Sequence, residues 1–125
     1  MAKVLGLGGI FFKAQDPKAL LAWYQRALGV PGPDYAFFQP ATMPDGAGTT
    51  FAPFAADTKY FAPSEQAFMF NFVVDDLDGA LRQVEEAGGK STGEVQDYSY
   101  GRFGWFLDPE GNKVELWQPK AKPAS

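Results

Sequence analysis

Residues 100–117 read YGRFGWFLDPEGNKVELW, and this stretch predicts a β-hairpin with its turn in the middle. Pro109 restricts one backbone φ angle, and Gly111 and Asn112 can adopt the positive φ values that tight turns require. Apolar and aromatic residues lie on both sides of the turn. We therefore expect strands at 102–107 and 113–118.

Two upstream segments have the boundary signals of helices. In the first, Asp16 is a suitable N-cap, Pro17 suits the first turn, and Gly29 offers a C-cap. The second segment begins at Asp75-Asp76 and ends at Gly88-Gly89. An apolar, β-prone run precedes each helix, and further strand candidates follow it. The expected strands outside the hairpin are 4–14, 35–39, 49–54, 68–74 and 94–98.

The chain also repeats itself at a distance of 60 residues. Between 9–29 and 69–89 there are five identical pairs, where random pairing would give about one. The pairs are Phe12 and Phe72, Asp16 and Asp76, Leu21 and Leu81, Ala27 and Ala87, and Gly29 and Gly89. Paired residues have matching roles in strand, cap and helix. We predict a single domain, 1–125, made of strand–helix–strands modules at 4–60 and 66–119, with a frayed tail at 120–125.

Composition excludes several kinds of chemistry. The 125 residues include neither Cys nor His, so disulfides, thiolate nucleophiles, iron–sulfur clusters and imidazole proton shuttles are ruled out. The net charge of −4 argues against nucleic acid or an anionic membrane as a partner. Aromatic residues make up 16% of the chain, and their rings must be buried or line a cavity.

No targeting or membrane segment is evident in the sequence. The apolar run at 4–12 contains three glycines and has no cleavage pattern after it, so it predicts a strand and no signal peptide. No run approaches the roughly 20 apolar residues of a membrane span. We expect a soluble cytoplasmic protein.

Tandem modules of this size, together with residues 100–117, resemble the vicinal oxygen chelate superfamily of glyoxalases, bleomycin-resistance proteins and extradiol dioxygenases. The resemblance covers about 5–119. Its most specific parts are 108–112, 114–116, and the strand-to-helix junctions at 13–17 and 73–77. It implies an α+β fold in which two βαβββ units form a curved mixed sheet around a cleft. It also implies a homodimer.

The family's metal ligands are largely missing at the positions that the resemblance indicates. Metal-dependent members have a His near the start of each module's first strand and a carboxylate on each module's last strand. Here Gly9 and Met69 take the histidine positions, and Thr49 or Thr50 takes one carboxylate position, while Glu115 remains. Since Zn²⁺ normally needs three protein ligands, we expect no metal and no other cofactor.

Glu115 is the candidate catalytic residue. Side chains alternate along a strand, so Glu115 lies on the opposite face from the apolar Val114 and Leu116. If the apolar pair faces the helices, Glu115 points into the cleft. The alternative is a structural ion pair with Lys13 or Arg102, or exposure on a solvated face.

The other candidate residues would contact a ligand in the cleft. Alternation along a strand places side chains from the first strand of each module in the cleft. Arg102 suits recognition of a carboxylate or phosphate. Core packing of Phe11 and Met69, and surface stacking of Arg102 on a tyrosine, are the alternatives. The predicted substrate-binding residues are Phe11, Lys13, Met69, Asn71, Arg102, Phe106 and Trp117.

These features predict a glyoxalase/bleomycin-resistance-like protein that binds a small, partly apolar organic molecule in an aromatic-lined pocket without a metal. The alternative is a small-molecule enzyme of the lyase, isomerase or dioxygenase type, with Glu115 as base or as the sole retained metal ligand. A third interpretation is a protein-interaction module whose cleft is filled by its own side chains.

Overall fold

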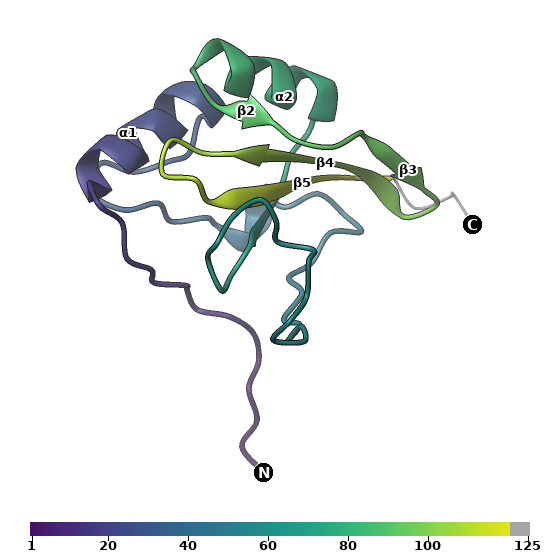
Figure 1. The fold of residues 1–125 in the computed structure, drawn as a ribbon. Helices are drawn as coiled ribbons and strands as arrows, with labels where there is room; N and C mark the ends of the chain where they lie inside the picture. Colours follow the sequence, from purple (N-terminus) through teal and green to yellow (C-terminus); the bar gives the residue numbers. More distant parts are fainter. Residues whose placement is uncertain (121–125) are drawn as a thin grey trace.

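The computed structural model describes residues 1–120, in which two helices cover one face of a mixed sheet (Figure 1). The helices are α1 (Pro17–Leu28) and α2 (Leu77–Glu86), with a short 3₁₀ helix, η1 (Pro40–Thr42). The strands are β1 (Phe70–Val73), β2 (Lys90–Ser91), β3 (Gln96–Tyr98), β4 (Gly101–Leu107) and β5 (Lys113–Pro119). The α+β fold class is confirmed.

The five-stranded sheet has the order β1-β5-β4-β2, and β3 also pairs with β4. β1 runs parallel to β5, whereas the pairs that β4 forms with β2, β3 and β5 are antiparallel. The long β4–β5 hairpin lies at the centre and turns at 108–112, as expected from the sequence.

Both predicted helices form, with both predicted N-caps and the Gly29 C-cap, while α2 ends at Glu86 with Ala87 as its C-cap, just before the predicted Gly88-Gly89. The Asp16 carboxylate accepts a hydrogen bond from the backbone N–H of Ala19 (3.1 Å), and Gly29 ends α1 at a φ of 66°. The Asp76 carboxylate accepts from the N–H of Gly79 (3.1 Å) at the start of α2. Within residues 1–120, neither helix has the length and apolar composition needed to cross a membrane.

The core lies between the helices and the sheet. β4 and β5 contribute Phe106, Val114 and Leu116, none of which has exposed surface. Gly104 allows α2 to approach β4, because a Cβ at this position would lie 2.9 Å from a methyl group of Leu81. The buried core residues of the two helices are Leu20, Trp23, Tyr24, Ala27, Leu77, Ala80 and Val84.

The turn between β4 and β5 is fastened to α1 by a buried hydrogen-bond network. The Oδ1 atom of Asp108 accepts from the backbone N–H groups of Glu110 (2.9 Å) and Asn112 (3.0 Å). Its Oδ2 atom accepts from the Tyr24 hydroxyl (2.7 Å) and the Asn112 amide (2.9 Å). Burial, together with the Asp108 charge, raises the pKa of Tyr24 far above its ordinary value. Tyr24 therefore remains a hydrogen-bond donor at neutral pH.

The first half of the chain differs from the sequence prediction. The described part of 4–60 contains α1 and η1 but none of the strands expected at 4–14, 35–39 and 49–54. A segment becomes a strand only where a neighbour offers a hydrogen-bonding edge, and the N-terminal segment runs away from the sheet (Figure 1). All strands lie in the predicted second module, 66–119, so the two-module sheet is not formed within residues 1–120.

The expected tail at 120–125 lies, apart from Lys120, outside the described residues. Lys120 itself forms an ion pair with Asp97 of β3 at 2.9 Å, and both side chains are largely exposed. A solvent-exposed pair of this kind contributes about 0–1 kcal/mol. Replacement of Asp97 should therefore change the stability little, and this residue can serve as a control in experiments on other parts of the protein.

The core packing predicts a large effect of truncating Phe106. Its ring has no exposed surface, and the centre of this ring lies 5.9 Å from that of Trp23 and 6.3 Å from that of Tyr24. We expect Phe106→Ala to lower the free energy of unfolding by about 3–5 kcal/mol in urea denaturation followed by circular dichroism.

Phe11→Ala is the matched control, because this ring is 97% exposed and its loss should change stability by no more than about 0.5 kcal/mol. If Phe106→Ala does not fold, Phe106→Leu should fold with a smaller loss. Equal stability of the Phe106 and Phe11 variants would contradict this packing.

Candidate functional site

The face of the sheet away from the helices, here called the open face, carries the polar and aromatic residues of the central strands. Glu115 of β5 lies beside Asn71 of β1 and opposite Trp105 of β4. Phe103 lies opposite Trp117 on the same face. Glu115 thus lies on the side away from the helices, as strand alternation predicts.

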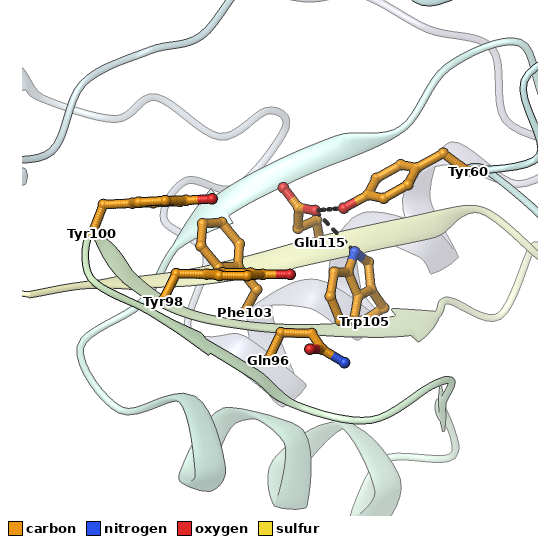
Figure 2. A pocket seen from close by; sticks show the side chains of 7 residues that line it. All are labelled: Tyr60, Gln96, Tyr98, Tyr100, Phe103, Trp105 and Glu115. Carbon is orange, nitrogen blue, oxygen red and sulfur yellow. Dashed lines mark hydrogen bonds between the residues drawn. The ribbon is translucent and has the colours of Figure 1, made fainter.

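A pocket of about 620 Å³ opens on this face. Six of its seven lining side chains come from the β3–β4–β5 part of the sheet, and one comes from the segment before β1. Figure 2 shows these residues, which are Tyr60, Gln96, Tyr98, Tyr100, Phe103, Trp105 and Glu115.

Glu115 is held by three neutral donors. Its Oε2 atom accepts from the Tyr60 hydroxyl (2.5 Å) and from Nε1 of Trp105 (2.9 Å), as the dashed lines in Figure 2 show. Its Oε1 atom accepts from the Asn71 amide (2.6 Å). Because the donors come from three separate parts of the chain, they determine the position of the carboxylate at the wall of the pocket.

Tyr60 connects the segment before β1 to the open face. Besides its bond to Glu115, its backbone carbonyl accepts from Nζ of Lys113 (2.6 Å). The same Nζ lies 5.1 Å from the centre of the Tyr60 ring and 5.8 Å from that of Trp105. Burial, and then the bond to Glu115, raises the pKa of the Tyr60 hydroxyl well above its ordinary range, so it acts as a donor at neutral pH. Burial lowers the pKa of Lys113.

The other end of the pocket is built from stacked rings. Tyr98 and Tyr100 are nearly parallel, with centroids 5.4 Å apart. Phe103 packs edge-on against both tyrosine rings, at 5.8 and 5.7 Å, and stacks on Trp117 at 6.1 Å. Gly101 makes this arrangement possible, because its φ is 150° and a Cβ there would lie 2.4 Å from Nε1 of Trp117. Both tyrosine hydroxyls point toward the Glu115 side of the pocket (Figure 2).

The structure brings three of the predicted site residues to the open face. Glu115 lines the pocket and Asn71 donates to it. Trp117 lies behind Phe103, and its indole N–H donates to the carbonyl of Tyr100 (3.3 Å). These three residues come from β1 and β5, whose register is parallel and continuous.

Two predicted residues lie on the helix-covered face of β4. Phe106 is fully buried in the core. Arg102 forms a two-pronged ion pair with Asp78 of α2, at 3.1 and 3.2 Å. This pair raises the pKa of Arg102 and lowers that of Asp78. Neither Phe106 nor Arg102 lines the pocket, because even-numbered residues of β4 point toward the helices.

The remaining predicted residues also lie outside the pocket. Phe11 and Lys13 are exposed, and Met69 is half-buried just before β1. Their expected positions rested on side chains that alternate between the two faces of strands at 4–14 and 68–74. Because 4–14 forms no strand and β1 begins only at Phe70, this alternation does not place Phe11, Lys13 or Met69.

Sequence reasoning missed most of the pocket lining. Phe103 and Trp105 could have been found, because alternation along β4 places them on the face that Glu115 occupies. Tyr98 and Tyr100 flank the β3–β4 turn, and their stacking depends on its geometry. The sequence around Tyr60 does not identify it as a site residue, since its contact with Glu115 spans 55 residues of sequence.

The residues present do not fit the divalent metal that the family resemblance implies. The chain has no His or Cys, and among residues 1–120 no three acidic side chains gather into a group that could hold a metal ion. Both oxygens of Glu115 already accept hydrogen bonds from neutral donors. Glu115 alone is therefore too small a ligand set for such an ion.

Comparison with solved structures identifies a protein of similar fold and partial matches to two others. TioX from Micromonospora sp. ML1 matches over 86% of this chain and 93% of its own, with 20% identity and a TM-score of 0.52. TnmS3, an antibiotic binding protein from Streptomyces sp. CB03234, matches with 29% identity and a TM-score of 0.38 over 43% of this chain. A glyoxalase/bleomycin resistance protein/dioxygenase superfamily member from Sphaerobacter thermophilus DSM 20745 matches with 28% identity and a TM-score of 0.36 over 39% of this chain.

The matches to TnmS3 and the Sphaerobacter protein span 45% and 40% of those chains, less than half of each. No curated protein matches this chain. The model of the glyoxalase-like domain family matches residues 9–117, which is most of the sequence. The chain therefore belongs to the glyoxalase-like domain family, within the vicinal oxygen chelate superfamily that its sequence resembles.

Proposed function

We propose that this protein binds a small, partly apolar organic molecule in the pocket on the open face, without a metal. The observation that carries the proposal is the position of Glu115. Three neutral donors hold its carboxylate at the wall of a pocket lined with aromatic rings.

The size and lining of the pocket support this function. Small-molecule sites typically have volumes of roughly 300–1,000 Å³, apolar walls and a few polar groups that orient the ligand, and this pocket has about 620 Å³. The rings supply apolar surface. The Gln96 amide, the hydroxyls of Tyr98 and Tyr100, and the Glu115 carboxylate supply polar contacts.

This function predicts that removal of a pocket ring weakens ligand binding. We expect Tyr100→Ala to weaken binding of acridine, a planar neutral probe, by about 2- to 10-fold, because one stacking surface is lost. Isothermal titration calorimetry measures the dissociation constant. Tyr35→Ala is the matched control, since Tyr35 is also exposed (70%, against 61% for Tyr100) but does not line the pocket. Equal effects of the two substitutions would contradict binding at this site.

An enzyme in which Glu115 acts as base is the alternative function. A carboxylate has about four lone-pair directions, and Glu115 uses three of them, so one direction on Oε1 can still take a proton from a substrate. If Glu115 is the base, Glu115→Gln abolishes turnover while ligand affinity is kept. If the protein only binds, no turnover is measured in the unchanged protein.

We also propose a homodimer, as expected from the family resemblance. The outer edge of β1 has no strand partner within residues 1–120, and such edges readily pair with another chain. Val4 and Leu5 each expose 89% of their surface, which favours burial against a second copy. The cytoplasmic location stays a prediction.

Native mass spectrometry of gently purified protein tests the dimer and the metal together. We expect twice the mass of one chain, with no stoichiometric divalent metal when purification avoids chelators. A monomer at micromolar concentration would refute the dimer. Tightly bound Mn, Fe, Ni or Zn would refute the metal-free site, independently of the oligomeric state.

A further inference from the structure

We propose that the ligand of this pocket is a small organic cation, with its positive charge beside Glu115 and its apolar body against the tyrosine rings. This inference rests on the proposed binding function and specifies the chemical class of the ligand. It depends on three features of the site, which are the charge of Glu115, its unused acceptor position and the aromatic faces around it.

The Glu115 carboxylate has no cationic partner within 4 Å among residues 1–120. Among residues 1–120, the ion pairs are Arg102 with Asp78 and Lys120 with Asp97. No Lys or Arg of the described part of the chain, residues 1–120, lines the pocket. The three groups bonded to Glu115 are an amide, an indole and a phenol, all neutral. Lys113 acts on Glu115 only at longer range, because its Nζ is bound to the Tyr60 carbonyl and the two side chains form no ion pair within 4 Å. A half-buried charge is most stable when an opposite charge lies in direct contact with it, and a cationic ligand would supply that contact.

Glu115 can accept one further hydrogen bond. Its Oε2 atom has two donors, Tyr60 and Trp105, while Oε1 has one donor, Asn71. Two carboxylate oxygens offer about four acceptor directions. A protonated amine can use the remaining direction, and a quaternary or ring-borne cation can lie beside the carboxylate without donating.

The aromatic faces of the pocket also favour a cation. The negative face of an aromatic ring attracts ammonium and related groups within about 6 Å of its centre. Lys113 already uses this attraction, with Nζ 5.1 Å from Tyr60 and 5.8 Å from Trp105. Its ammonium is bound to the carbonyl of Tyr60. The opposite end of the pocket presents the rings of Tyr98 and Tyr100 (Figure 2), and the lining contributed by residues 1–120 includes no basic side chain.

A matched pair of probes tests this inference in the unchanged protein. N-methylacridinium and acridine have nearly the same shape, but in mildly alkaline buffer only the first is charged. By isothermal titration calorimetry at low salt, we expect the cation to bind about tenfold more tightly. Added salt should weaken binding of the cation and leave acridine nearly unchanged, because only a charge interaction is screened.

Substitution of Glu115 locates the effect. Glu115→Gln should weaken binding of the cation about tenfold while changing acridine binding by no more than about twofold. Asp97→Asn is the matched control, because it removes the same charge from a residue outside the pocket. We expect it to leave both affinities unchanged. Circular dichroism checks that each variant is folded, and the comparison of probes in the unchanged protein does not depend on the variants.

The outcomes separate this inference from the proposed function. Equal affinity of the unchanged protein for both probes would overturn the cation inference and leave small-molecule binding supported. Equal loss of cation binding in the Glu115 and Asp97 variants would also overturn it, since long-range charge would then explain the preference. Failure of both probes to bind would overturn the inference and the proposed function together.

Discussion

Burial of one side of the β4–β5 hairpin beneath two helices determines which residues are available to a ligand. Phe106, Val114 and Leu116 have no exposed surface, and they occupy every second position on the two strands. The residues between them, including Trp105 and Glu115, must then lie on the open face. A shift of one residue in register would exchange the two sets. Core packing and site composition are therefore consequences of a single constraint.

The turn of the hairpin extends this constraint to the first half of the chain. Asp108 satisfies the donors of the turn and also accepts from Tyr24 of α1. Glu110 accepts from the backbone N–H groups of Gln15 (2.6 Å) and Asp16 (3.0 Å), directly before α1. The turn residues thus place α1 on the sheet even though no strand of the first half joins it. These two roles explain why three hydrogen-bonding side chains, those of Asp108, Glu110 and Asn112, lie within the short turn 108–112.

The open face combines a charge with aromatic surface in a way that differs from a metal centre. A metal site needs several ligands whose lone pairs converge on one point. Here the donors of Tyr60, Asn71 and Trp105 converge on Glu115 instead, and they orient its carboxylate without neutralising it. The rings of Tyr98 and Tyr100 line the same pocket as this carboxylate. This arrangement supports the proposed recognition of an organic molecule by shape and charge.

Local signals in the sequence determined both helices, their N-caps, the turn at 108–112 and the two faces of β5. Each of these depends on backbone preferences or on the regular alternation of a strand. The composition, which includes no Cys or His, also determined that no thiol or imidazole of this chain belongs to the candidate site. Tertiary structure alone decided which apolar segments became strands, because a strand needs a partner edge that its own sequence does not encode. It likewise decided that Arg102 pairs with Asp78 and that Tyr60 reaches Glu115 across 55 residues, since contacts between distant segments depend on how the whole chain packs.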